Sequence, residues 1–150
     1  MPDNVLGTTT VMQVGIIVRD IEAKVRTWAQ LLGLPAPTII MTDPVEQAQT
    51  EYKGQRTPAR AKLAFFQLGQ VALELIEPLD GPSTWRDQLE AHGESIHHIA
   101  FAVHGMRDKL AGLASEGMSL IQKGEYTGGR YAYVDGSAAL GVILELLEDD

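Results

Sequence analysis

Two segments of this 150-residue chain are near copies of each other. Residues 71–77 read VALELIE and residues 142–148 read VILELLE, and the fourth position of each is a glutamate, Glu74 or Glu145. Short runs this apolar are typical of buried strands. Because side chains alternate along a strand, each glutamate points to the face opposite the two leucines that flank it. The repeated segment predicts that the chain folds from two related halves.

A second pair of segments supports the duplication. Residues 12–18 (MQVGIIV) align with residues 97–103 (HHIAFAV), so that Gln13 and His98 occupy equivalent positions. With the two glutamates, four oxygen or nitrogen donors then lie inside strands where valine or isoleucine would be ordinary. Burial of a carboxylate without a partner is costly, and a divalent cation would offset that cost. The pattern therefore predicts a metal site.

Composition limits the class of protein. A chain of 150 residues with 45% hydrophobic content is sufficient for one globular domain, which we expect to span residues 1–150. The formal charge of −8 argues against a nucleic-acid partner, because phosphate binding requires basic surface. The chain has no cysteine, and we find neither a signal peptide nor an apolar run of about 18 residues. We expect a cytoplasmic protein that does not bind membranes and acts on a small molecule.

The order of elements repeats once. We expect a first half at residues 11–78, a linker helix at 79–94 and a second half at 95–150, each half folding as βαβββ. The expected strands lie at 12–18, 38–41, 62–66, 71–78, 97–103, 119–122, 130–134 and 142–148, with helices at 21–33 and 106–117. The predicted fold class is α+β, with a mixed sheet curved into an open cup around a pocket.

Two different offsets relate the halves near their ends. Residues 130–134 (RYAYV) match residues 62–66 (KLAFF) at an offset of 68, whereas the two glutamates are offset by 71. Such a discrepancy is accommodated in a loop. The loop before the last strand is predicted to be three residues longer than its counterpart.

Residues 11–148 resemble the vicinal oxygen chelate superfamily, which includes glyoxalase I, methylmalonyl-CoA epimerase, extradiol dioxygenases and bleomycin-resistance proteins. The segments LELIEPL, GESIHHIAFAV and GVILELLE are most similar to the epimerase branch. The resemblance implies paired βαβββ modules around one divalent ion (Zn, Ni, Co or Mn), and a homodimer. It also implies the metal ligands Gln13, Glu74, His98 and Glu145, a set similar to that of some glyoxalase I enzymes.

These ligand types suggest proton transfer next to a carbonyl. An amide, two carboxylates and an imidazole suit a hard or borderline divalent ion and leave two octahedral positions for a substrate. A carbonyl bound there would be polarised, and Glu74 and Glu145 would serve as catalytic proton acceptor and donor. We expect an epimerase of a methylmalonyl-CoA-type acyl-CoA. The alternatives are a glyoxalase I-type lactoylglutathione lyase and a non-catalytic binding or resistance protein, although the complete ligand set argues against the latter.

The sequence departs from both enzyme branches. Epimerases have an additional glutamate at the start of their third strand, where this chain has Pro58. Glyoxalase I contacts glutathione carboxylates through an arginine and an asparagine, and the matching positions hold Ile17 and Pro78. The substrate therefore stays open between these branches and a third.

Residues 42–61 have no counterpart in the second half. This polar segment contains Lys53, Arg56 and Arg60, followed by Lys62, with no acidic residue between the first and the last of these. Such a cluster is able to bind an anionic substrate tail such as a coenzyme A phosphate. The alternative is a solvated loop whose charges only keep it soluble.

Other polar residues have simpler explanations. Glu77 and Glu148 are interpreted as ordinary residues at strand ends. His97 should point away from its neighbour by strand alternation and is expected to be packed, not to bind metal. Tyr131 and Tyr133 share one strand face and either line the cup or pack in the core, and the core is the favoured expectation.

Overall fold

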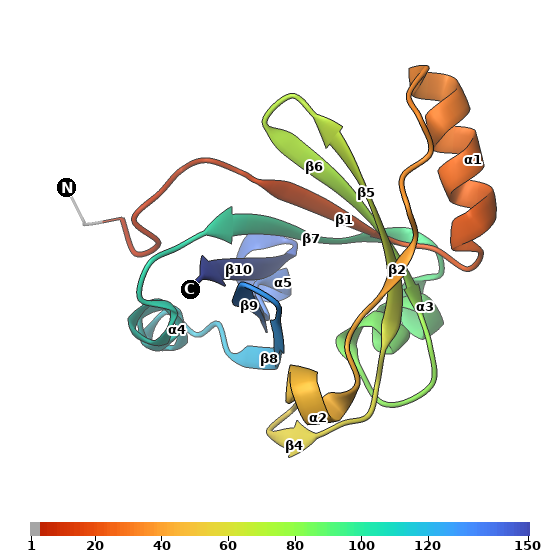
Figure 1. Ribbon diagram of the computed structural model, residues 1–150. Helices are drawn as coiled ribbons and strands as arrows, with labels where there is room; N and C mark the ends of the chain where they lie inside the picture. Colours follow the sequence, from red (N-terminus) through yellow and green to blue (C-terminus); the bar gives the residue numbers. More distant parts are fainter. Residues whose placement is uncertain (1–3) are drawn as a thin grey trace.

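Ten strands form one curled mixed sheet within residues 4–150, the part of the chain that the computed structural model describes (Figure 1). The strands are β1 (Gln13–Ile17), β2 (Ile40–Met41), β3 (Glu51–Tyr52), β4 (Gln55–Arg56), β5 (Ala61–Leu68), β6 (Val71–Pro78), β7 (Ser95–Ala102), β8 (Leu120–Tyr126), β9 (Gly129–Val134) and β10 (Ile143–Asp149). The helices are α1 (Ile21–Leu32), α2 (Val45–Ala48), α3 (Thr84–His92), α4 (Met106–Ser115) and α5 (Ser137–Leu140). Among these described helices, none has both the length and the apolar character needed to cross a membrane.

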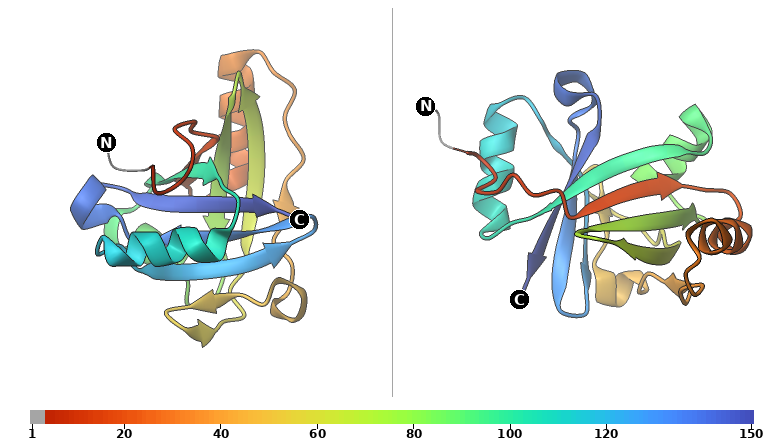
Figure 2. Two further views of the ribbon diagram at one scale, coloured as in Figure 1. Left: turned by 90° about the vertical axis from the view of Figure 1, so that its left-hand side faces the viewer. Right: turned by 90° about the horizontal axis from the view of Figure 1, so that it is seen from above.

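The sheet joins two similar halves at its centre. Its strand order is β2-β5-β6-β1-β7-β10-β9-β8-β3-β4. β1 runs parallel to β6, β7 runs parallel to β10, and β1 and β7 pair antiparallel across the junction. The views in Figure 2 show the sheet curling into an open half-barrel. The predicted α+β class with a cup-shaped mixed sheet is confirmed.

Two helices cover the outer face of this sheet, one in each half. Leu73 and Leu75 of β6 pack in one cluster with the apolar side of α1, and Leu144 and Leu146 of β10 pack in another with α4. Figure 2 shows α1 and α4 on opposite sides of the molecule. Because alternate residues face opposite ways, the glutamate between each pair of leucines points to the inner face.

The glutamates at the strand ends lie outside the central site and bind the starts of these helices. Glu77 accepts a hydrogen bond from the backbone N–H of Ile21, and Glu148 accepts one from that of Met106, both at 2.9 Å. The first N–H groups of a helix have no partner within the helix, and a carboxylate there also interacts favourably with the helix dipole. Equivalent residues therefore do the same structural work in both halves.

The linker helix α3 closes one end of the inner face. Trp85 packs there with the side chains of Ile17, Ile76, Tyr131 and Tyr133, forming a third core cluster. The Trp85 indole N–H donates to the Tyr133 hydroxyl at 3.0 Å, which satisfies both groups in a dry environment. Both tyrosines are therefore core residues, as favoured from the sequence.

The segment 42–61 crosses from one edge of the sheet to the other. β2 pairs with β5 at the first edge, whereas β3 pairs with β8 at the opposite edge, although only nine residues separate β2 and β3. α2 lies within this crossing, beside β8 in Figure 1, and β3 and β4 form a short hairpin after it. The corresponding connection of the second half is the tight turn of β8 and β9, where Tyr126 pairs with Gly129. The segment thus has no counterpart, as predicted.

The predicted difference in loop length is also confirmed. Phe65 lies opposite Glu74 in the β5–β6 hairpin, and Tyr133 lies opposite Glu145 in the β9–β10 hairpin. These partners are 9 and 12 residues apart in sequence, a difference of three. The longer connection contains the short helix α5.

Candidate metal centre

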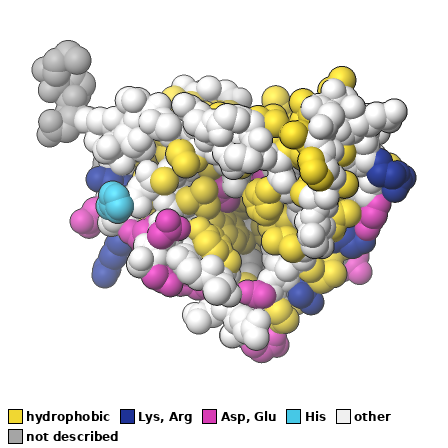
Figure 3. Space-filling view, turned by 45° about the horizontal axis from the view of Figure 1, so that its top comes forward, with side chains coloured by type: hydrophobic (Ala, Val, Ile, Leu, Met, Phe, Trp, Pro, Cys, Tyr) yellow, Lys and Arg dark blue, Asp and Glu magenta, His cyan; other side chains and the backbone are white. Residues whose placement is uncertain are grey.

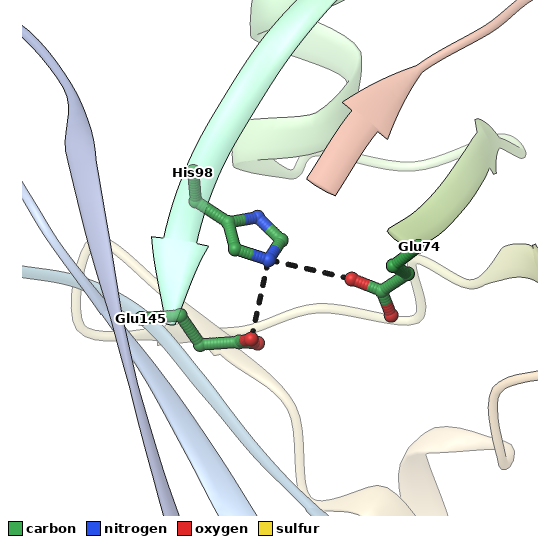
Figure 4. A group of neighbouring side chains, drawn as sticks. All are labelled: Glu74, His98 and Glu145. Carbon is green, nitrogen blue, oxygen red and sulfur yellow. Dashed lines mark ion pairs between the residues drawn. The ribbon is translucent and has the colours of Figure 1, made fainter. Parts of the chain in front are cut away.

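The four central strands each contribute one polar side chain to the inner face. Gln13 lies on β1, Glu74 on β6, His98 on β7 and Glu145 on β10. All four side chains are buried, and His98 is fully enclosed. Figure 4 shows the two carboxylates directed at the same ring nitrogen of His98 from opposite halves of the sheet. Four residues predicted to act together are therefore neighbours in space.

The donor atoms of these side chains converge. Nε2 of His98 lies 3.4 Å from Oε1 of Glu74 and 3.2 Å from Oε1 of Glu145. The inward terminal atom of the Gln13 amide lies 2.9 Å from the same nitrogen. That amide atom is also 2.7 Å from Oε1 of Glu145 and 3.1 Å from Oε1 of Glu74. The arrangement concentrates negative charge around one imidazole.

Burial and mutual charge shift the ionisation of this cluster. Burial lowers the pKa of His98, but the carboxylates of Glu145 and Glu74 outweigh it and raise the pKa to about 9. Burial raises the pKa of Glu74, and the neighbouring Glu145 raises it further, against a lowering by His98. A positive charge at this point therefore stabilises the charged carboxylates, and the protonated imidazolium of His98 supplies such a charge.

A divalent ion fits the same position. Neighbouring ligand atoms on an octahedral ion with bonds of about 2.1 Å lie about 3.0 Å apart, close to the separations between these donors. The amide of Gln13 is able to adapt to either state of the site. With its oxygen inward it adds a fourth acceptor for an ion, and with its nitrogen inward it donates to both carboxylates. The donor set therefore suits a hard or borderline divalent cation.

His97 does not point away from His98, and that expectation was wrong. The pairing of β7 with β1 shifts register, because Gly15 pairs with His98 and Ile16 pairs with Ile96. His97 is the additional residue of this bulge, which places both rings on the inner side with their Nδ1 atoms 2.8 Å apart. It is buried and packed, as expected, and burial together with the adjacent His98 lowers the pKa of His97 well below its ordinary value.

Gly15 is a residue of the site that the sequence interpretation missed. A Cβ added there would lie 2.2 Å from Cε1 of His98, so any larger residue would displace the ring. A glycine inside a strand often marks a close approach of this kind. The equivalent position of the second half is Ala100, and this difference between two otherwise similar segments was the available signal.

The inner face opens into a hollow. Figure 3 shows hydrophobic side chains on both sides of this hollow and acidic side chains at its margin. Phe65, the cross-strand partner of Glu74, is 38% exposed, and Tyr126 is 39% exposed. Burial, followed by the nearby carboxylates of Asp149 and Glu145, raises the pKa of Tyr126 to about 12. A small molecule entering here would meet aromatic surface next to the carboxylates.

The basic residues around segment 42–61 have separate surroundings. The Lys53 ammonium lies 5.2 Å from the ring centroid of the preceding tyrosine. Arg60 donates through Nε to a backbone carbonyl at 2.8 Å, and Lys62 forms an ion pair with α1 at 3.2 Å. Arg56 is exposed, and its side chain makes no hydrogen bond or ion pair with residues 4–150. Binding of an anionic tail by Lys53, Arg56 and Arg60 stays a prediction.

Comparison with solved structures places the fold among known ones. A hypothetical protein, BH1468 from Bacillus halodurans C-125, superposes with a TM-score of 0.66 at 24% identity, covering 94% of each chain. Methylmalonyl-CoA epimerase from Mycobacterium tuberculosis superposes with a TM-score of 0.65 at 20% identity, covering 100% of this chain and 93% of the epimerase. The Streptomyces coelicolor methylmalonyl-CoA epimerase variant S115T, in complex with 2-nitronate-propionyl-CoA, gives 0.63 at 21% identity over 94% of both chains. These likenesses establish the fold.

Sequence comparison adds the family. The uncharacterized protein YqjC of Bacillus subtilis (strain 168) is 36% identical over 92 residues, which are 59% of this chain and 66% of that protein, just under two thirds of its length. The family model of the glyoxalase/bleomycin resistance protein/dioxygenase superfamily matches residues 12–134, most of the chain. The same range contains both copies of the strand that begins each half. The chain therefore belongs to the glyoxalase/bleomycin resistance protein/dioxygenase superfamily.

Proposed function

We propose that this protein is a divalent-metal-dependent isomerase or lyase that transfers a proton next to a bound carbonyl group. The best candidate activity is the epimerisation of an acyl-CoA of the methylmalonyl-CoA type. The observation that carries this proposal is the convergence of Gln13, Glu74, His98 and Glu145 on one buried point.

The proposed roles follow from the donor atoms. Gln13, Glu74, His98 and Glu145 would hold the ion, which when bound would polarise a substrate carbonyl as a Lewis acid. Glu74 and Glu145 approach the same nitrogen of His98 from opposite halves (Figure 4), so they would lie on two sides of a substrate bound to the ion. One carboxylate would accept the proton from the α-carbon and the other would return one to the opposite face. The raised pKa of Glu74 makes its protonated form easier to reach.

Two observations separate the candidate substrates. The similar epimerase structures include complexes with 2-nitronate-propionyl-CoA and with methylmalonyl-CoA, which favours an acyl-CoA. The ligand set Gln13, Glu74, His98 and Glu145 resembles that of some glyoxalase I enzymes, which favours a glyoxalase I-type lyase as the second candidate. A non-catalytic binding protein has no need for two buried carboxylates around an imidazole, so this third candidate ranks lowest.

Solvent exchange tests the activity directly. Protein freed of metal with a chelator is incubated in D₂O with methylmalonyl-CoA or with a hemithioacetal, and Zn, Ni, Co or Mn is added back. We expect metal-dependent deuterium incorporation at the α-carbon of the acyl-CoA. Turnover of the hemithioacetal alone would favour the lyase. Stoichiometric metal without exchange in either substrate would contradict the proposed chemistry.

A pair of variants tests the roles of the acids. Glu145→Gln should abolish deuterium exchange, because the amide cannot accept the proton and is a poorer metal ligand. Glu90→Gln, on the exposed surface of α3, is the matched control and should exchange like the wild type. Exchange at the wild-type rate in Glu145→Gln would reject the two-carboxylate mechanism.

The homodimer implied by the family resemblance is tested separately by analytical ultracentrifugation.

A further inference from the structure

A chain of buried hydrogen bonds continues from the candidate metal centre into the linker helix. Nδ1 of His98 lies 2.8 Å from Nδ1 of His97, and Nε2 of His97 lies 3.1 Å from the hydroxyl oxygen of Thr84. Thr84 is the first residue of α3, and all three side chains are buried. These contacts join a residue on β7 to the start of a helix 13 residues earlier in the chain.

The far end of this chain of contacts is fixed in place. The backbone N–H of Thr84 donates to Oε1 of Gln122 at 2.9 Å, and Nε2 of Gln122 donates to the Tyr131 hydroxyl at 3.1 Å. Gln122 is fully buried on β8. Thr84 therefore has little freedom to move away from His97. The ring of Tyr133 also packs against both histidines, with centroid distances of 4.9 and 5.1 Å.

The positions of the protons follow from what each atom faces. A cation at Nε2 of His98 needs the lone pair of that nitrogen, so the ring proton must lie on Nδ1 and donate to Nδ1 of His97. His97 must then carry its own proton on Nε2, where it donates to the Thr84 hydroxyl. The reverse direction would place a proton on Nε2 of His98, where the ion binds. Only the direction in which His98 donates to His97, and His97 donates to Thr84, is compatible with metal binding.

We propose that His97 and Thr84 are positioning residues that hold His98 with its proton on Nδ1 and its Nε2 lone pair directed at the metal. This inference rests on the proposed metal site. Partners that hold the second nitrogen of a ligating histidine typically raise metal affinity by about 10- to 100-fold. The bulge in β7 brings His97 into this position.

Matched substitutions separate positioning from packing. Asparagine places an acceptor near the position of the histidine Nδ1, whereas leucine fills a similar volume without one. We expect His97→Leu to weaken Zn²⁺ binding by about 10- to 100-fold and His97→Asn to restore most of that loss, measured by chelator competition. Thr84→Val should weaken binding and Thr84→Ser should not. Thermal unfolding of the metal-free variants shows whether each pair is equally folded.

Nitrogen NMR supplies a readout that does not depend on metal. Long-range ¹H–¹⁵N spectra of the metal-free wild type should show His97 protonated at Nε2 and bare at Nδ1. A proton on Nδ1 of His97 would overturn the inference, as would equal Zn²⁺ affinities of His97→Leu and the wild type. If the wild type binds no divalent ion, the proposed function fails, and the NMR result alone then supports or rejects the direction of the hydrogen bonds.

Discussion

The two halves of this protein share a frame and differ in one connection. In the first half, residues 42–60 separate the second and third strands of the βαβββ unit and cross to the far edge of the sheet. In the second half, a two-residue turn makes the equivalent connection between β8 and β9. The shared frame positions the four donors, and the asymmetric crossing ties the first half to the second. The candidate metal centre and the link between the halves therefore lie in different parts of the molecule.

A similar comparison holds within the central strands. Gly15 and Ala100 are equivalent residues, yet the position against the ring of His98 is a glycine in the first half and its counterpart in the second half is an alanine. Likewise Gln13 and His98 are equivalent, and only one of them titrates. The duplicated pattern thus contains small differences at the positions where one half must accommodate a side chain of the other.

The largest expected effect comes from Gly15→Ala, which gives the first half the alanine that the second half has at the equivalent position 100. In Gly15→Ala the new Cβ would lie 2.2 Å from Cε1 of His98, so the ring must move. We expect metal affinity to fall by about 100-fold, the upper end of the range for loss of a ligand's supporting contacts. Ala100→Gly is the control and should bind metal normally, with a loss of stability of about 0.5–1 kcal/mol. Isothermal titration and thermal unfolding measure the two effects, and normal binding by Gly15→Ala would contradict the geometry.

The second prediction concerns pH and the difference between Gln13 and His98. Because the pKa of His98 is about 9 without metal, one proton must leave for each ion bound below that pH. Apparent metal affinity should rise by up to about tenfold per pH unit between pH 6 and 9 and then level off. Gln13→Leu should lower affinity but keep this slope. A flat profile in the wild type would show that His98 is not a ligand.

The same shift has a consequence for the metal-free protein. A histidine whose pKa is higher in the folded state stabilises the fold below its unfolded pKa near 6.5. That contribution is lost as the pH rises through about 9. Unfolding of the chelated protein in urea should therefore become easier over this range, and metal should remove the dependence.

A smaller effect tests the crossing segment. The Tyr52 hydroxyl donates to the Asp87 carboxylate, which fastens β3 to α3, and the backbone N–H of Lys53 donates to the carbonyl of Ile121 at 2.7 Å. Tyr52→Phe should cost about 1 kcal/mol or less and speed hydrogen exchange at Lys53. Tyr126→Phe is the control in the second-half hairpin. Equal exchange in both variants would show that this bond does not fasten the segment.

The smallest expected difference lies between the two helix caps. Arg130 lies 2.9 Å from Glu148, whereas Lys62 lies 3.9 Å from Glu77, so Glu148→Gln should lower the melting temperature more than Glu77→Gln. The backbone N–H of Met106 leads the interactions that lower the pKa of Glu148. Its stabilisation is therefore present above about pH 4.5 and lost as the pH falls through the lower folded value. The melting temperature of Glu148→Gln should therefore lie further below that of the wild type at pH 7 than at pH 3.

Much of the fold and the candidate ligands could be predicted from the sequence, because duplicated segments reveal equivalent positions without any knowledge of contacts. The glutamates of the repeated strands and the three additional residues of the last hairpin are examples. His97 could not be placed, because a bulge arises from pairing with β1 and strict alternation does not anticipate it. The path of residues 42–61 was also hidden, since two-residue strands show no periodicity.

Local pattern and tertiary structure decided different properties. The sequence by itself determined which residues are repeated, which side of each strand they occupy and which donor chemistry is available, because these depend on spacing along the chain. Only the tertiary structure decided that His98 and Gln13 lie 2.7–3.4 Å from each other and from both carboxylates, that a bulge brings His97 behind His98, and that segment 42–61 reaches the opposite edge. Those properties depend on the register between strands that are distant in sequence.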